Sequence, residues 1–326
     1  MKISVIIATR NRADALEKIS LSSLAKQDFR DFEVIIWDAS DNDKSKIVVE
    51  NFIQSHPGII VRYFKAPRVG SASQRNDAVK VAREDIIFFI DDDSEVSSDG
   101  IYALNETFKD RKICGAGLPL KNINQKKYTS SLVLKKIFLN LYGIIFRLYH
   151  RDRKERRKVL LSGTITASLN NNNSGEEVEW LSGCSMAFRK EIFDKFHFEE
   201  KLQKFGGYAL AEDIQFSHSL VRNKMKLIIS EKGYVIHHEA KGGRLENEKA
   251  FAAQIYNRFI VWKTAIFPYN KLSIFVYLWS LIGQILLNYL EGILNRNIDK
   301  IRGTNIGLKS IVFDVFGKIC KKSRKN

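Results

Sequence analysis

Three consecutive carboxylates follow an apolar run in the first third of the chain. Asp91, Asp92 and Asp93 come directly after residues 86–90. Adjacent like charges repel one another, and a divalent cation or solvating water relieves that repulsion. Hard oxygen ligands of this kind suit Mg2+ or Mn2+, which such sites share with phosphate oxygens. The triplet therefore indicates either metal-dependent phosphate chemistry or a solvated strand end that opens a turn.

Polar side chains also follow or face other strand ends in the first half of the chain. Thr9 and Asp38 come directly after apolar runs, and Arg75 and Asn76 lie in a predicted first helical turn. Backbone N–H groups and the helix dipole favour anions at such a turn. An aspartate beside a strand can accept two hydrogen bonds from a base or a ribose. Each residue alone also fits a structural role, as a helix cap, a turn residue or a surface charge.

Alternating strand and helix patterns must position these side chains. Apolar runs at residues 3–8, 32–37, 59–64 and 86–90 predict strands, and helical patterns separate them. This alternation predicts βαβ units and a mostly parallel sheet. Right-handed crossovers then place the carboxyl ends of the strands, with their polar loops, along one edge of the sheet.

Further motifs follow in the second half, and together the motifs form an ordered series. They are residues 3–12, Trp37-Asp38-Ala39-Ser40, Ser73-Gln74-Arg75-Asn76, Asp91-Asp92-Asp93, Trp180-Leu181-Ser182-Gly183-Cys184 and Glu212-Asp213. In this order, over about residues 1–240, the chain resembles family 2 glycosyltransferases with the GT-A fold. The resemblance implies an activated sugar donor, usually a nucleoside diphosphate sugar, and inversion at the anomeric carbon.

The resemblance also implies roles for individual residues. Thr9 and Asp38 would hold the nucleobase, Asp92 would contact the ribose, and Gly183 would line the sugar and acceptor site. The full set of donor-binding candidates is Thr9, Arg12, Asp38, Arg75, Asn76, Asp91, Asp92 and Gly183.

The metal and the base are assigned in the same way. Asp91 and Asp93 match the family's D-x-D pair, with Asp93 as the expected direct ligand of Mg2+ or Mn2+. Asp213 would be the catalytic base, with Glu212 beside it; without the other motifs, both acids would be read as favourable charges at a helix N-terminus. His238 is the candidate third metal ligand. The alternation along residues 235–238 does not choose between His237 and His238, and a structural or acceptor-facing role stays open.

Composition limits the partners. The 326 residues carry a formal net charge of +16, which implies attraction to nucleic acid, phosphorylated substrates or an acidic membrane surface. The three cysteines lie far apart in sequence, so neither a metal-ligand spacing nor a disulfide framework follows. A reducing, cytosolic location and the absence of a signal peptide are expected.

Two apolar stretches and a basic run indicate a membrane partner. Residues 272–290 contain no charge, which is near the short limit for a membrane span. Residues 131–149 are similarly apolar, and residues 151–158 are basic. The combination favours an interfacial or shallowly inserted helix on an anionic bilayer. A buried core helix and a solvated loop are the alternatives.

These inferences predict an α/β protein with the GT-A architecture: a mostly parallel sheet flanked by helices, with a C-terminal helical extension. Residues 1–245 would form the catalytic domain, with an apolar and basic insertion at 131–175, and residues 246–326 a helical, membrane-associating region. The expected enzyme is an inverting, metal-dependent glycosyltransferase at the cytoplasmic face of the membrane. It would use a nucleoside diphosphate sugar and a glycan or lipid-linked acceptor, and no nucleic acid.

Two other functions compete with this prediction. A nucleotidyltransferase on a similar sheet would need a lysine-bearing, glycine-rich loop after the first strand, and residues 9–12 do not supply it. A non-catalytic basic protein bound to membrane or nucleic acid would explain the net charge. It would not explain the buried strand that ends in three aspartates, or the Glu212-Asp213 pair.

Overall fold

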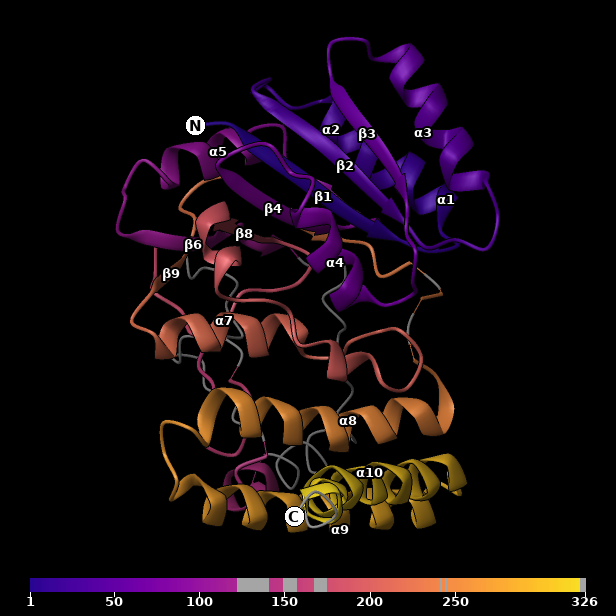
Figure 1. Cartoon of the computed structure of the whole chain (residues 1–326), viewed down its shortest axis with the longest axis vertical. Helices are drawn as coiled ribbons and strands as arrows, with labels where there is room; N and C mark the ends of the chain where they lie inside the picture. Colours follow the sequence, from indigo (N-terminus) through magenta and orange to yellow (C-terminus); the bar gives the residue numbers. More distant parts are fainter. Residues whose placement is uncertain (122–140, 149–156, 167–174, 241, 244, 323–326) are drawn as a thin grey trace, which may run out of the picture.

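A mixed sheet of seven strands organises the chain (Figure 1). The computed structural model describes residues 1–121, 141–148, 157–166, 175–240, 242–243 and 245–322. The strand order is β3-β2-β1-β4-β8-β6-β9. The strands are β1 (Ile3–Thr9), β2 (Phe32–Asp38), β3 (Ile60–Lys65), β4 (Ile86–Asp91), β6 (Ile113–Gly117), β8 (Met186–Arg189) and β9 (Lys226–Ile229). Within this sheet β8 pairs antiparallel with both of its neighbours, and the other pairings are parallel.

Helices cover both faces of the sheet, which explains why β4 is apolar without interruption from Ile86 to Ile90. In β4, Ile87 and Phe89 belong to one buried cluster, whereas Ile86 and Phe88 belong to the other. Successive side chains of a strand point to opposite faces, so a strand buried on both faces needs apolar residues at every position. The predicted mostly parallel sheet flanked by helices is thus confirmed.

The helices divide between the two faces. One face packs against the N-terminal helical stretch, α3 and α5, and the other against α4, α7 and α8. The N-terminal stretch is α1 (Ala13–Ala15), a π-helical segment (Leu16–Leu21) and α2 (Ser22–Ala25). The other helices before α8 are α3 (Lys44–Ser55), α4 (Ser71–Val79), α5 (Gly100–Thr107), two 3-10 turns (Lys190–Asp194 and Glu200–Gln203) and α7 (Glu212–Arg222).

Strand register brings the polar strand ends together. Thr9 at the end of β1 pairs with Asp38, and Ala8 pairs with Asp91 on the other side. A second sheet of order β5-β10-β7 lies beside this edge and comprises β5 (Ser94–Val96), β7 (Leu120–Lys121) and β10 (Val235–His237). In it, His237 pairs with Ser94, so the end of β10 reaches the acidic triplet.

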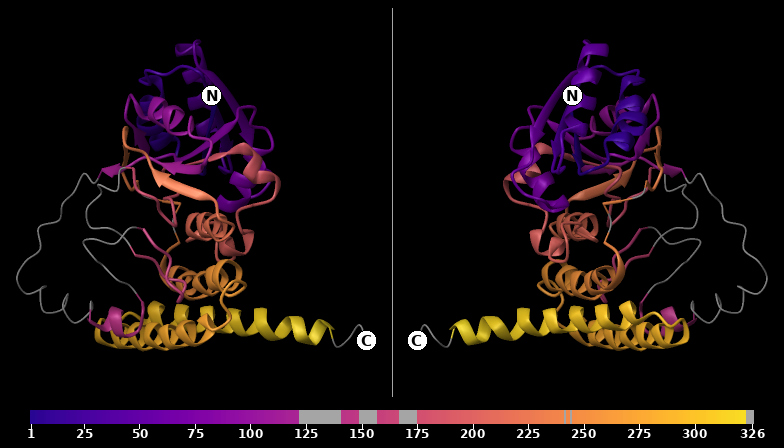
Figure 2. Two further views of the ribbon diagram at one scale, coloured as in Figure 1. Left: turned by 90° about the vertical axis from the view of Figure 1, so that its left-hand side faces the viewer. Right: turned by 90° about the vertical axis from the view of Figure 1, so that its right-hand side faces the viewer.

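The C-terminal part is helical, as predicted. It comprises α8 (Asn247–Val261), a π-helical segment (Trp262–Ile266), α9 (Ser273–Leu294) and α10 (Ile298–Lys322). Figures 1 and 2 show α7, then α8, then α9 and α10 as successive layers below the sheet. The proposed domain boundary at residue 245 stays a prediction. Much of the predicted 131–175 insertion, including residues 151–156 of the basic run, lies outside the described residues.

Candidate active site

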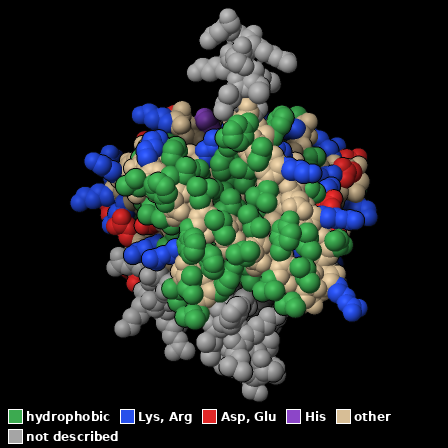
Figure 3. Space-filling view, turned by 90° about the horizontal axis from the view of Figure 1, so that it is seen from below, with side chains coloured by type: hydrophobic (Ala, Val, Ile, Leu, Met, Phe, Trp, Pro, Cys, Tyr) green, Lys and Arg blue, Asp and Glu red, His purple; other side chains and the backbone are tan. Residues whose placement is uncertain are grey.

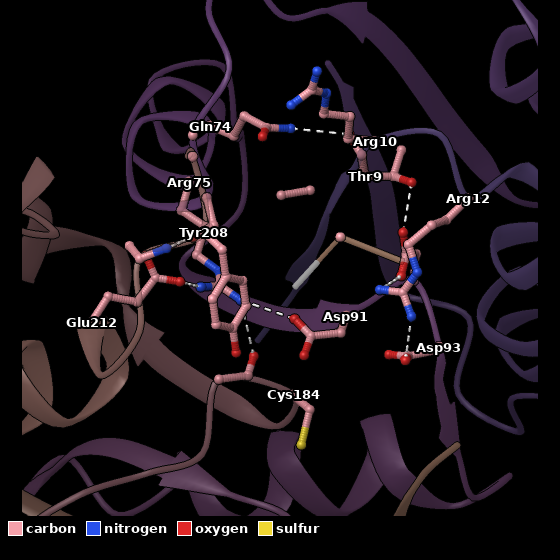
Figure 4. A pocket seen from close by; sticks show the side chains of 18 of the residues that line it. Thr9, Arg10, Arg12, Gln74, Arg75, Asp91, Asp93, Cys184, Tyr208 and Glu212 are labelled. Atoms are coloured by element: carbon pink, nitrogen blue, oxygen red, sulfur yellow. Dashed lines mark hydrogen bonds and ion pairs between the residues drawn. The ribbon is translucent and has the colours of Figure 1, made fainter. Parts of the chain in front are cut away.

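A cavity of about 460 Å3 opens at the carboxyl edge of the large sheet (Figure 4). Its walls come from the loop after β1, the start of α4, the end of β4 and the start of α7. The segment around Gly207 closes a further side. Gly207 has a φ of +91°, and an added Cβ would lie 2.9 Å from Val69 Cγ1, so glycine is required where these loops meet.

The acidic triplet and a histidine form one wall. Ligand atoms of Asp91, Asp93 and His237 all lie within 4.8 Å of one another. His237 Nε2 is 3.1 Å from Asp93 Oδ1 and 3.8 Å from Asp91 Oδ2. Burial acts to raise the pKa of Asp93, but His237 and Arg12 together hold it well below its ordinary value. Asp93 is therefore an anion near neutral pH, facing a nitrogen ligand and a second carboxylate.

Asp92 has a different environment from Asp93, its neighbour in the triplet. Its carboxylate accepts a hydrogen bond from Thr9 Oγ1 at 2.7 Å and lies 2.7 Å from Arg12 Nη1. Burial raises the pKa of Asp92 to about 7, although Arg12 and Thr9 oppose that change. Arg12 also contacts Asp93 Oδ2 at 2.5 Å. Arg12 thus partly balances the like charges that the sequence places side by side.

Arg75 joins the two acidic sides of the cavity. This buried guanidinium lies 3.0 Å from Asp91 Oδ1 and pairs with Glu212, and it donates to the carbonyl oxygen of Gly183 at 3.3 Å. Figure 4 shows Arg75 between Asp91 and Glu212, with Tyr208 beside them. Glu212 also accepts a hydrogen bond from Ser71 Oγ at 3.1 Å. Arg75 consequently fixes the start of α7 relative to the end of β4.

Asp213 lies in the same wall as Gly183. The Gly183 N–H donates to Asp213 Oδ2 at 2.8 Å, and the Ile214 N–H donates to Oδ1 at 2.9 Å. Burial raises the pKa of Asp213, opposed by these two N–H groups. Ala211, directly before α7, has a left-handed φ of +69°, a strained conformation for a residue with a Cβ. This conformation sets where Glu212 and Asp213 enter the cavity.

The structure brings together most of the predicted site residues. The cavity lining includes Thr9, Arg12, Arg75, Asp91, Asp92, Asp93, Gly183, Glu212 and Asp213. Three predicted site residues, Asp38, Asn76 and His238, are not among the described residues that line the cavity. Asp38 is buried and accepts hydrogen bonds from the Ser40 N–H and the Tyr63 hydroxyl, both at 2.8 Å. Asn76 donates to the Phe198 carbonyl at 3.0 Å and accepts from its N–H at 2.9 Å.

The histidine assignment is corrected. His237, and not His238, faces the acidic pair. His238 Nε2 instead lies 2.7 Å from Glu95 Oε2. Adjacent residues of an extended chain point to opposite sides, so only one of the two histidines can reach the cavity. The geometry thus favours His237 as the candidate metal ligand, where the sequence analysis named His238.

Other lining residues were not predicted. Gln74 donates to the Thr9 carbonyl at 3.1 Å and to the Trp37 carbonyl at 2.9 Å, so it joins α4 to the ends of β1 and β2. Gly207 and Tyr208 also line the cavity. Gln74 stands in the Ser73-Gln74-Arg75-Asn76 motif, which was the available signal for it. The Gly206-Gly207 pair was the signal for a special backbone conformation beside a site.

Comparison with known proteins identifies the family of this sequence. The model of "Glycosyl transferase family 2" matches residues 4–196. A GalNAc(5)-diNAcBac-PP-undecaprenol beta-1,3-glucosyltransferase of Campylobacter jejuni is 34% identical over 105 residues, which are 32% of this chain and 33% of that protein. A poly(ribitol-phosphate) beta-glucosyltransferase of Bacillus spizizenii is 26% identical over 43% of this chain and 24% of its own length. The matches thus span a third or less of these relatives.

Solved structures support the fold. Staphylococcus aureus TarS residues 1–349, in complex with UDP-GlcNAc, gives a TM-score of 0.53 at 18% identity and covers 90% of this chain and 75% of that chain. A second solved structure is the mannosyltransferase PcManGT of Pyrobaculum calidifontis with GDP-Man and Mn2+. It gives a TM-score of 0.50 at 14% identity and covers 97% of this chain and 86% of that chain. The sheet therefore has the GT-A fold, and this chain belongs to glycosyltransferase family 2.

Proposed function

We propose that this protein transfers a sugar from a nucleoside diphosphate sugar to an acceptor hydroxyl, with inversion at the anomeric carbon. One observation carries the proposal. A single cavity contains an Asp91–Asp93–His237 cluster on one wall and the Asp213 carboxylate on another. The first can hold a cation that binds a diphosphate, and the second can take the proton of an attacking hydroxyl.

Asp91, Asp93 and His237 would hold the metal ion. Asp93 Oδ2 already accepts from the Ala240 N–H at 2.8 Å and contacts Arg12 at 2.5 Å, so Oδ1, which faces His237, is the oxygen available to a cation. Two carboxylates suit Mg2+ or Mn2+, and the imidazole nitrogen favours Mn2+ of the two. When bound, the ion would stabilise the negative charge that develops on the departing diphosphate.

Asp213 is the proposed base. The acceptor oxygen forms a bond to the anomeric carbon, the bond from that carbon to the diphosphate oxygen breaks, and the hydroxyl proton passes to Asp213. The N–H groups of Gly183 and Ile214 hold this carboxylate in position. Glu212 is a poorer candidate because it is buried and paired with Arg75. We assign Glu212 and Arg75 to positioning the walls of the cavity.

The acceptor is proposed from the relatives' names and from the predicted membrane association. Those relatives act, by name, on a lipid-linked saccharide and on poly(ribitol-phosphate). We infer a glycan or lipid-linked acceptor for this chain, used at the cytoplasmic face of a membrane in cell-surface polysaccharide or glycolipid synthesis. Nucleic acid is not an expected partner, because the buried acidic triplet and Asp213 have no use in a phosphate-backbone site.

Donor binding can be tested by thermal shift. UDP or GDP at a hundredfold excess over its dissociation constant should raise the melting temperature by about 5 °C or more with Mn2+, because binding to the native state adds about 2.7 kcal/mol. The chelator EDTA should remove the shift, and inorganic pyrophosphate should give a smaller one. If no nucleoside diphosphate stabilises the protein with Mn2+, but DNA binds in a strongly salt-dependent way, the protein is a non-catalytic basic binder.

The histidine pair offers a matched test of the metal site. His237→Ala should weaken Mn2+ affinity at least about tenfold, since even indirect supports of a metal site contribute that much. His238→Ala removes an identical side chain at the next position and should change the affinity little, because His238 pairs with Glu95 outside the cavity. Calorimetric titration of each variant with Mn2+ and UDP measures the difference. The opposite ranking would restore His238 as the ligand.

A further inference from the structure

An exposed apolar face closes the end of the molecule farthest from the sheet. Figure 3 shows hydrophobic side chains gathered across this face, which α9 and α10 form. Phe275 is 69% exposed and Phe313 is 72% exposed, and Leu278, Leu286, Ile293 and Phe316 are also exposed. We call this surface the basal face. Soluble monomers seldom expose so continuous an apolar surface unless it binds a partner.

The pattern of α9 is the reverse of that of a core helix. Its exposed positions Phe275, Leu278, Ile282, Leu286, Leu290 and Ile293 follow a helical spacing of three or four residues. Its buried positions are small or polar apart from Tyr277, which stacks on Trp262. Asn288 Nδ2 donates to Thr304 Oγ1 at 3.0 Å, and the Tyr289 hydroxyl donates to Asn305 at 2.5 Å, so polar contacts join α9 to α10. The apolar side of α9 is thus directed outward by its packing.

Charge around the basal face favours an anionic partner. Lys271, Arg296 and Lys309 are exposed near the ends and the flank of these two helices, and Figure 3 shows lysines and arginines around the rim. Two acids of these helices are paired within the protein: Glu291 pairs with Lys300, and Asp314 lies 3.8 Å from Lys263. An apolar centre with a basic rim matches the acyl chains and the anionic headgroups of a bilayer surface.

We propose that the basal face lies in the headgroup–acyl boundary of an anionic phospholipid bilayer, with α9 and α10 parallel to the membrane plane. The 22 residues of α9 could cross a bilayer by length, since they extend for about 33 Å. Its polar contacts with α10 argue against crossing, because α10 carries Arg302 and Lys309 into the same layer. A second copy fits less well, since two basic rims would face each other. The proposal rests on the proposed function only for its purpose, namely to hold the enzyme near a membrane-borne acceptor.

Vesicle flotation of the full chain tests this orientation. The protein should float with vesicles of phosphatidylcholine and phosphatidylglycerol, and raising the salt should weaken the binding without abolishing it. Phe275→Glu, Leu286→Glu and Phe313→Glu combined should lower the partition coefficient about tenfold or more. The matched control combines Ile47→Glu and Ile60→Glu, which are 54% and 61% exposed on α3 and β3, and it should bind as the wild type does. Circular dichroism and Mn2+-dependent UDP binding should be unchanged in both proteins.

Depth can be measured at Trp279, which is 47% exposed on the basal face. Lipids brominated near the headgroup should quench its fluorescence more than lipids brominated near the bilayer centre, and Trp279→Phe should remove this difference. Stronger quenching from the centre would mean insertion across the bilayer and would overturn the in-plane orientation.

Vesicle binding by the triple variant that equals that of the wild type would overturn the basal face as the membrane-binding surface. If the wild type ignores vesicles and sediments as a dimer that the triple variant abolishes, the basal face binds a second copy. Any of these results with UDP binding intact leaves the proposed transfer reaction untouched.

Discussion

Asp213→Asn should lower the turnover number by about 10²–10⁴, the usual contribution of general-base catalysis, with donor affinity nearly intact. Asparagine has almost the same shape, but its amide cannot take the proton of the acceptor hydroxyl. Asp213 accepts two backbone N–H bonds, from Gly183 and Ile214, and the amide can keep only one of them. Transfer rate should therefore be measured at saturating donor and acceptor, together with the melting temperature and UDP affinity.

Glu212→Gln is the neighbouring control. It should reduce turnover less than Asp213→Asn, and it should destabilise the fold, because Glu212 is the buried partner of Arg75 and accepts from Ser71. Because Arg75 keeps Asp91 as a partner, the loss should be smaller than the about 3–5 kcal/mol of unfolding free energy that a buried charge without any partner costs. If Asp213→Asn turns over nearly as well as the wild type and Glu212→Gln is folded but inactive, then Glu212 is the base.

The same carboxylate should set the acid side of the pH profile. Burial raises the pKa of Asp213, although the Gly183 and Ile214 N–H groups oppose the change. A base must be ionised to accept a proton, so turnover should be complete above this raised pKa and lost as the pH falls through it. The midpoint should lie above that of an ordinary aspartate. The residual activity of Asp213→Asn should lack this limb; an unchanged limb would assign it to another group.

The arrangement of the site followed from the sequence where strand geometry fixes it. The apolar run before Asp91 had to be a buried strand, and parallel neighbours had to end at the same edge. Ala8 therefore pairs with Asp91 in the register of β1 and β4, and the next residue, Thr9, donates to Asp92 at the predicted edge of the sheet. The position of Arg75 followed similarly, because a helix that follows a parallel strand begins at the carboxyl edge of the sheet.

Side-chain direction could not be predicted in the same way. Arg75 and Asn76 are adjacent in α4, and about 100° of rotation separates them, so one reaches the cavity and the other holds Phe198. His237 and His238 differ by one pleat, and their orientation depends on how β10 pairs with β5. That pairing joins residues far apart in sequence, and no local pattern reports it. Asp38 was placed at the correct strand end, but Tyr63, on the next strand, engages its carboxylate.

Asp93→Asn should abolish Mn2+-dependent donor binding and lower transfer by about 10²–10³ or more, the loss expected when the stabilisation of developing charge is removed. Asp93 is almost fully buried and is an anion, since His237 and Arg12 lower its pKa against the effect of burial. The amide keeps the size of the side chain but removes the charge that would attract a cation. Calorimetric titration with Mn2+, with and without UDP, measures the loss directly.

Glu95→Gln is the matched control for that substitution. It makes the same change from carboxylate to amide beside the other histidine, because Glu95 Oε2 lies 2.7 Å from His238 Nε2. Glu95 is not among the described residues that line the cavity. Mn2+ affinity and transfer should therefore stay close to wild type in Glu95→Gln. Both variants should be checked by circular dichroism, since Asp93 also accepts from Arg12 and from the Ala240 N–H.

The two variants separate a metal role for Asp93 from a structural one. A folded Asp93→Asn protein that binds UDP without Mn2+, and gains nothing when Mn2+ is added, has lost the cation site alone. If Asp93→Asn instead keeps the wild-type response to Mn2+, the cation is not held by this carboxylate, and the Asp91–Asp93–His237 cluster is an internal ion pair. An equal loss in Glu95→Gln would also contradict the assignment, because the effect would then follow from disturbing the β5–β10 pair that both residues adjoin.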